Sequence, residues 1–184
     1  MTIIWGDWKD EDTKMLETLW SGVENVNLVH VKYFNNVVEK AVDLAIADEK
    51  DTLLFCGHGT SYGLLAPKSY GTYMIHQGNA GLIQAKNVIG VMCYGAEFAE
   101  KAGLHGLFTS MFISNINEAT DYCVNTTPQE INSENAIVLH MINNIFRNGQ
   151  SLRDCYESLK NLDADSGGDF SDLMKFNVGG IKLL

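Results

Sequence analysis

The stretch Leu53-Leu54-Phe55-Cys56-Gly57-His58-Gly59-Thr60 joins an apolar run to a histidine held between two glycines. Four successive apolar residues closed by glycine predict a buried strand, Thr52 to Cys56, that delivers a side chain to the edge of a sheet. Glycine on each side leaves the backbone free to adopt a positive φ, or lets another segment approach closely. Packing alone gives a histidine little reason to be there, so His58 is a candidate functional residue.

A second stretch repeats this arrangement further along the chain. In Ile89-Gly90-Val91-Met92-Cys93-Tyr94-Gly95, an apolar run again ends in a reactive side chain and a glycine. The pattern predicts a strand from Asn87 to Met92 with Cys93 just beyond its end.

Strand and helix patterns alternate along the chain. Strands are expected at Thr2–Gly6, Val26–Phe34, Thr52–Cys56, Asn87–Met92, Gly106–Ile113 and Phe176–Leu184. Helices are expected at Asp10–Trp20, Val37–Ala47, Glu97–Ala102, Ala136–Arg147 and Leu152–Leu162, with a turn-rich segment at Gly57–Gly78 and an irregular polar one at Val124–Glu134. This order predicts an α/β fold, a mainly parallel sheet of about six strands flanked by helices on both faces. Without a repeat or a long linker, residues 1–184 are expected to form a single domain.

In such sheets ligands bind beyond the carboxyl ends of the strands, where His58 and Cys93 both lie. A cysteine and a histidine on adjacent strand ends make a nucleophile and a proton carrier. A helix N-terminus and a neighbouring histidine are expected to lower the pKa of the thiol. The backbone N–H groups of Gly59 and Cys93 are candidate donors to an oxyanion.

An apolar strand ending in His-Gly, followed by one ending in Cys-x-Gly, resembles the caspase-like cysteine peptidases: caspases, metacaspases, legumain, gingipains and clostripain. The resemblance runs from Thr2 to about Asp121. It implies a caspase-like three-layer sandwich, His58 as the catalytic histidine, Cys93 as the nucleophile, a peptide or protein substrate and no cofactor. It also implies that the segment from Ser114 to Asp121 builds the pocket for the P1 side chain, the residue on the acyl side of the scissile bond. Candidate pocket residues in this segment are Ser114, Asn117, Glu118 and Asp121.

The charged residues favour a basic P1 side chain. Glu118 and Asp121 are the candidate carboxylates, whereas the only arginines, Arg147 and Arg153, lie in the C-terminal helical region. A carboxylate in a partly desolvated pocket selects a cation by charge pairing. The formal charge of −10 adds a long-range attraction for basic substrates.

Composition excludes several other classes of protein. The chain of 184 residues is 46% hydrophobic, as in a folded globular protein, and its 13 basic and 23 acidic residues disfavour a nucleic-acid partner. No apolar run is long enough to span a membrane, and the first seven residues do not resemble a secretory signal. The four cysteines have no disulfide-type spacing, which favours a cytoplasmic protein. The oligomeric state stays open.

Three alternatives stand beside the peptidase hypothesis. One is a catalytically inactive caspase-like domain with a binding or regulatory role. Another is a class I glutamine amidotransferase-like hydrolase, which needs a histidine downstream of Cys93, where the candidates are His105 and His140. A zinc site from His58, His76 and Cys93 lacks metal-binding spacing, so no metal is expected. The acidic turn at residues 163–169 is expected to be a solvated, helix-capping loop.

Overall fold

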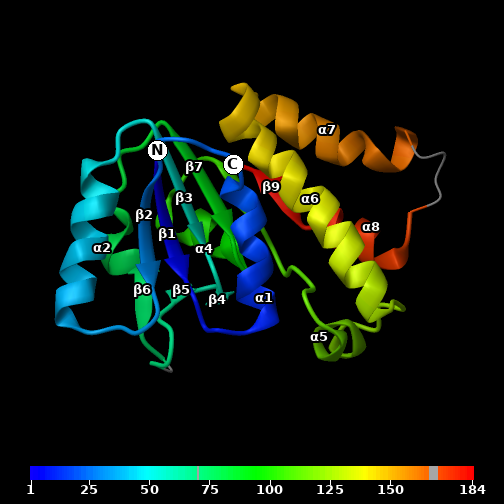
Figure 1. Cartoon of the computed structure of the whole chain (residues 1–184), viewed down its shortest axis with the longest axis horizontal. Helices are drawn as coiled ribbons and strands as arrows, with labels where there is room; N and C mark the ends of the chain where they lie inside the picture. The colour runs from blue at the N-terminus through cyan, green and yellow to red at the C-terminus, as the bar shows by residue number, and fades with distance from the viewer. Residues whose placement is uncertain (70, 166–169) are drawn as a thin grey trace.

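The computed structural model describes residues 1–69, 71–165 and 170–184, and its centre is a six-stranded sheet (Figure 1). The strand order is β2-β1-β3-β7-β8-β9, in which the first five strands are parallel and β9 is antiparallel to β8. The strands are β1 Thr2–Gly6, β2 Asn27–Val31, β3 Thr52–Cys56, β7 Asn87–Val91, β8 Leu107–Thr109 and β9 Ile181–Leu183. The predicted α/β fold with a mainly parallel sheet is therefore confirmed.

Different elements cover the two faces of this sheet. The helices are α1 Glu11–Lys14, the 3-10 helix η1 Met15–Trp20, α2 Asn36–Asp48, α3 Gln77–Ala80, α4 Gly95–Ala102, α5 Ile116–Asp121, α6 Pro128–Asn148, α7 Leu152–Asp165 and α8 Asp172–Gly179. Apolar side chains of η1, α6, α7 and α8 pack on one face, and those of α2 and α4 pack on the other (Figure 1). Each strand can bury alternate side chains on both faces, which explains its nearly continuous apolar sequence.

The turn-rich segment Gly57–Gly78 contains more structure than expected. It forms a small antiparallel sheet of β4 Gly59–Thr60, β5 Gly63–Leu65 and β6 Tyr73–His76. Leu64 and Ile75 from this sheet are fully buried beside α4, so short apolar runs among the glycines pair with one another. Strands this short leave little periodicity to detect.

Three other element predictions need correction. The segment Val124–Glu134 is not irregular throughout, because α6 begins at Pro128 behind a capping box made by Thr127 and Glu130. The expected last strand is helical over its first part, since the Ser171 side chain caps α8, and only Ile181–Leu183 is a strand. The expected helix Asp10–Trp20 divides into α1 and η1.

The strand expected at Gly106–Ile113 ends early, at Thr109. Beyond it, the Ser110 carbonyl accepts a hydrogen bond from the N–H of Tyr94, and the Ile113 N–H donates to the side chain of Asn177. Within the acidic turn predicted at 163–169, residues 166–169 lie outside the described part of the chain. None of the described helices is long and apolar enough to cross a membrane.

A buried amide network anchors the segment that follows β8. The Asn177 Oδ1 atom accepts from the Ile113 N–H at 2.8 Å, while Asn177 Nδ2 donates to the Ile113 carbonyl at 3.1 Å and to Asn135 Oδ1 at 2.9 Å. Asn135 donates to the same carbonyl at 2.9 Å. Asn135 and Asn177 are each 1% exposed. The two side chains thus fasten residues 112–114 to α6 and α8.

Replacing Asn177 with leucine is expected to destabilise the protein through this network. The variant keeps the branched shape of the side chain but leaves the Ile113 N–H buried without an acceptor, which costs about 1–3 kcal/mol. Asn148→Leu is the control, because Asn148 makes only an exposed bond to Asn144, and its effect should stay within about 0.5 kcal/mol. Urea unfolding of both variants measures the difference. Equal stabilities would contradict the role given to Asn177.

Candidate active site

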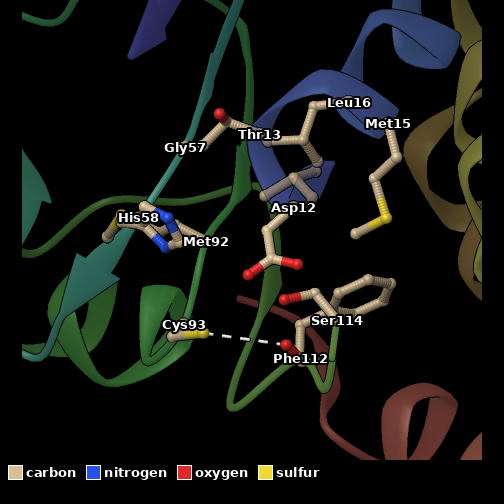
Figure 2. A pocket seen from close by; sticks show the side chains of 11 residues that line it. Asp12, Thr13, Met15, Leu16, Gly57, His58, Met92, Cys93, Phe112 and Ser114 are labelled. Carbon is tan, nitrogen blue, oxygen red and sulfur yellow. Dashed lines mark hydrogen bonds between the residues drawn. The ribbon is translucent and has the colours of Figure 1, made fainter. Parts of the chain in front are cut away.

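The pairing of β3 with β7 brings His58 and Cys93 to one edge of the sheet. Cys56 lies opposite Val91 in the parallel register, and each candidate residue follows its strand by two positions. The Gly57 N–H donates to the Val91 carbonyl at 3.3 Å, which continues the pairing beyond β3. His58 and Cys93 consequently line the same pocket, and Figure 2 shows both side chains beside its interior.

The two glycines around His58 have separate physical roles. Gly57 has a φ of 142°, which L side chains rarely adopt. At Gly59 a Cβ would lie 2.6 Å from the Met92 sulfur and 2.9 Å from the Cys93 carbonyl oxygen. A side chain at position 59 would therefore push against the turn that carries Cys93, and the close approach expected at these glycines is present.

Hydrogen bonds on both sides fix the turn at Cys93. The buried Thr109 hydroxyl accepts from the Met92 N–H at 3.0 Å and donates to the Met92 carbonyl at 2.7 Å. The Tyr94 N–H donates to the Ser110 carbonyl at 3.1 Å, and Tyr94 has a φ of 59° before α4 begins. The Cys93 thiol donates to the Phe112 carbonyl at 3.7 Å (Figure 2). The nucleophile candidate is thus positioned by β8 and the segment after it.

The expected lowering of the thiol pKa is wrong. Burial raises the pKa of Cys93 to about 11, and the carboxylates of Glu118 and Asp12 act in the same direction against the bond to Phe112. A thiolate in this pocket lacks hydration and faces like charges, so the neutral thiol is favoured. At neutral pH Cys93 is protonated, and its nucleophilic use requires a base.

Asp10 holds the histidine and was missed by sequence reasoning. The His58 Nε2 atom lies 2.8 Å from Asp10 Oδ2. Asp10 also caps α1, accepting from the Thr13 N–H at 2.8 Å and from its hydroxyl at 2.6 Å. Burial acts to raise the pKa of Asp10, but the hydrogen bonds from Thr13 and His58 outweigh it and hold that pKa below 3.8.

The ionised Asp10 carboxylate accepts a hydrogen bond from the Nε2–H group, which leaves Nδ1 as the basic atom of the ring. The edge-to-face contact with Trp8, at 5.5 Å between ring centroids, further limits the ring's orientation. Because Asp10 follows β1, a neighbour of β3, the strand-end rule that selected His58 would also have selected this carboxylate.

The structure brings most, but not all, of the other predicted residues to the site. Ser114 lines the small pocket shared by His58 and Cys93, while Gly59, Glu118 and Asp121 line a cleft of about 520 Å³ that also includes His58 and Cys93. Asn117 is exposed on α5 and lines neither space. In place of the expected Glu118 and Asp121, the carboxylate in the small pocket belongs to Asp12 (Figure 2).

The alternative histidines and the metal hypothesis find no support at this site. His105 and His140 are exposed and line neither the pocket nor the cleft. His76 caps α3 by accepting from the Gly78 N–H at 3.0 Å. Among the residues that the structure describes, no group of three or more His, Cys, Asp or Glu is arranged to hold a metal ion. All four cysteines are free thiols.

Comparisons with protein-family models, with curated proteins and with solved structures each give no match to this chain.

Alkylation of Cys93 by iodoacetamide is expected to follow the raised pKa. Because the thiolate reacts and the folded pKa is about 11, the rate should rise about tenfold per pH unit between pH 6.5 and 9.5. Peptide mapping by mass spectrometry gives this rate separately from that of the exposed Cys123. A rate that is independent of pH from 6.5 upward would instead indicate a preformed thiolate–imidazolium pair.

Proposed function

We propose that this chain is a cysteine hydrolase that cleaves peptide bonds, a peptidase of caspase-like architecture with a Cys93–His58–Asp10 triad. The observation that supports it most is the shared pocket at two adjacent strand ends, which a thiol and a carboxylate-bound imidazole both line. The central α/β sheet with helices on both faces is compatible with a caspase-like sandwich. The free cysteines fit a reducing compartment such as the cytoplasm.

The proposed reaction has two halves. In the first, His58 Nδ1 takes the thiol proton as Cys93 Sγ attacks the scissile carbonyl carbon, and Asp10 stabilises the resulting imidazolium. The C–N bond breaks, the departing amine takes the proton from His58, and a thioester remains on Cys93. In the second, His58 removes a proton from water as the water attacks the thioester, and the C–S bond breaks. The acid product leaves and the thiol regains its proton.

The high pKa of Cys93 is compatible with this sequence of steps. Because the resting thiol is neutral, proton removal has to accompany the attack, and a base held by Asp10 serves that purpose. The N–H groups of Gly59 and Cys93 are the proposed donors to the oxyanion, and the cleft of about 520 Å³ offers room for the peptide on both sides.

A second candidate function is peptide binding without cleavage. The raised pKa of Cys93 favours it, because such a thiol is a poor nucleophile without a base. In this case Cys93 and His58 would line a binding cleft without taking part in a reaction.

Hydrolysis of a positional library of fluorogenic peptides separates the two candidates. Cys93→Ala is expected to lower turnover at least about 1,000-fold and His58→Ala about 100- to 10,000-fold, with nearly unchanged melting temperature for His58→Ala. Cys123→Ala and His140→Ala are matched controls away from the pocket and should retain activity. No hydrolysis by the wild type, with unchanged peptide binding in Cys93→Ala, would favour the binding domain.

The role of Asp10 has a matched control within the chain. Asp10→Asn is expected to lower kcat about 100-fold or more with a small change in KM, because the amide no longer fixes Nε2 as the protonated atom of His58. Asp7→Asn breaks a similar 2.8 Å contact, to His30, away from the pocket, and should retain kcat. Equal kcat losses in the two variants would contradict a positioning role for Asp10.

A further inference from the structure

One carboxylate lies in the small pocket beside Cys93. Of the described residues that line this pocket, only Asp12 carries a carboxylate, and none is a lysine or an arginine. Figure 2 shows the Asp12 side chain pointing into the space between His58, Cys93 and Ser114. The lining of the pocket also includes the apolar side chains of Leu16 and Phe112. Asp12 is half-buried, and a partly shielded negative charge attracts a cation more strongly than a fully exposed one does.

The chain fixes Asp12 but does not use up its acceptor capacity. Asn115 Nδ2 donates to Asp12 Oδ2 at 2.8 Å, and the same amide caps α5 by accepting from the Glu118 N–H at 3.0 Å. A carboxylate has about four acceptor sites, so this bond orients Asp12 while leaving it able to bind a cationic donor. Asn115 thus serves to position the carboxylate.

We propose that Asp12 determines the substrate class, by selecting a lysine or arginine side chain at P1. This inference rests on the proposed peptidase function, because it assigns the pocket next to the nucleophile to the P1 residue. It also moves the selection away from Glu118 and Asp121. Glu118 lines the larger cleft and not this pocket, and its Oε2 atom already accepts from the N–H and hydroxyl of Ser114, at 2.8 and 2.9 Å. Asp121 is exposed, where solvent weakens its attraction.

The size of the pocket requires a wall to move when the side chain enters. The free space is about 20 Å³, enough for about one water molecule. Met15 forms part of this wall, is only partly buried and has an unbranched side chain that changes rotamer easily (Figure 2). Entry of the cationic chain is therefore coupled to displacement of Met15.

A cation beside Asp12 also changes the electrostatics of the nucleophile. The charge of Asp12 is one of the causes that raise the pKa of Cys93. Pairing it with the P1 ammonium or guanidinium reduces the repulsion that a thiolate experiences. A basic substrate is thus expected to improve the attack step as well as binding.

Three acyloxymethyl ketone probes that differ only at P1 test the proposal on the intact protein. The probe with lysine at P1 should label Cys93 at least tenfold faster than the probe with norleucine, its neutral counterpart. The probe with glutamate should label Cys93 most slowly. In Asp12→Asn the lysine rate should fall at least tenfold and the norleucine rate should rise, because the repulsion of the thiolate is removed. Glu11→Gln removes an equal charge from the exposed side of the same helix and should keep the preference. Met15→Ala should accelerate the labelling of Cys93 by the lysine probe, because the side chain that has to move is shortened.

Several outcomes overturn the proposal. A preference for norleucine or glutamate in the wild type, or an unchanged lysine preference in Asp12→Asn, contradicts selection by Asp12 and leaves the peptidase function standing. If no probe labels Cys93 faster than the exposed Cys123, the peptidase function itself fails. Should Asp12→Asn not fold, Asp12→Glu replaces it. That variant keeps the charge and is expected to retain the lysine preference. Loss of the lysine preference in Asp12→Glu would count against the proposal.

Discussion

The parallel pairing of β3 with β7, in which Cys56 lies opposite Val91, determines where the parts of the candidate site lie. Strand residues alternate between the two faces of a sheet, so a register shift by one position would reverse every buried side chain on one strand. The fully buried Leu53, Leu54 and Phe55 make such a shift costly. With the register fixed, His58 and Cys93 leave the sheet at the same level, and the positive φ of Gly57 starts the turn that carries His58.

Polar side chains from other elements then hold this edge in place. Thr109 fixes the backbone before Cys93, Asp10 orients His58, and the buried amides of Asn135 and Asn177 hold residue 113 near the pocket. Each of these groups has a partner, as buried polar groups require. The site is therefore assembled from the ends of β1, β3, β7 and β8 and from two C-terminal helices that contribute no reacting group.

The charge around the pocket opposes ionisation of the thiol in the unliganded protein. Burial and the carboxylates of Glu118 and Asp12 keep Cys93 neutral, so the site holds a thiol and not a thiolate at neutral pH. Under the proposed function, a general base and a cationic substrate side chain compensate for this. Such an arrangement would limit reaction of the thiol with other electrophiles while allowing it with the selected peptide.

The central strands, and the position of His58 and Cys93 at one edge of the sheet, could be predicted from the sequence because they follow local patterns. β1 and β3 have the predicted bounds, since a short apolar run ended by glycine is a strong signal. The small sheet after His58 and the start of α6 were missed, because their signals are two-residue pairings and a capping box. The raised pKa of Cys93 depends on burial and on carboxylates brought in from distant segments, which no local pattern reveals. Asp12 and Asn115 meet across 103 positions of sequence, so their contact needed the folded chain.

Trapping the acyl-enzyme is the most direct measurement of the central claim, that Cys93 forms a covalent intermediate in the shared pocket. The protein is mixed with a peptide ester of lysine, quenched with acid within milliseconds to seconds and analysed by intact mass and peptide mapping. The account predicts a mass increase equal to the acyl group, located on Cys93, removed by hydroxylamine and lost in Cys93→Ala. Ester hydrolysis that persists in Cys93→Ala, or an acyl group on another residue, would contradict it.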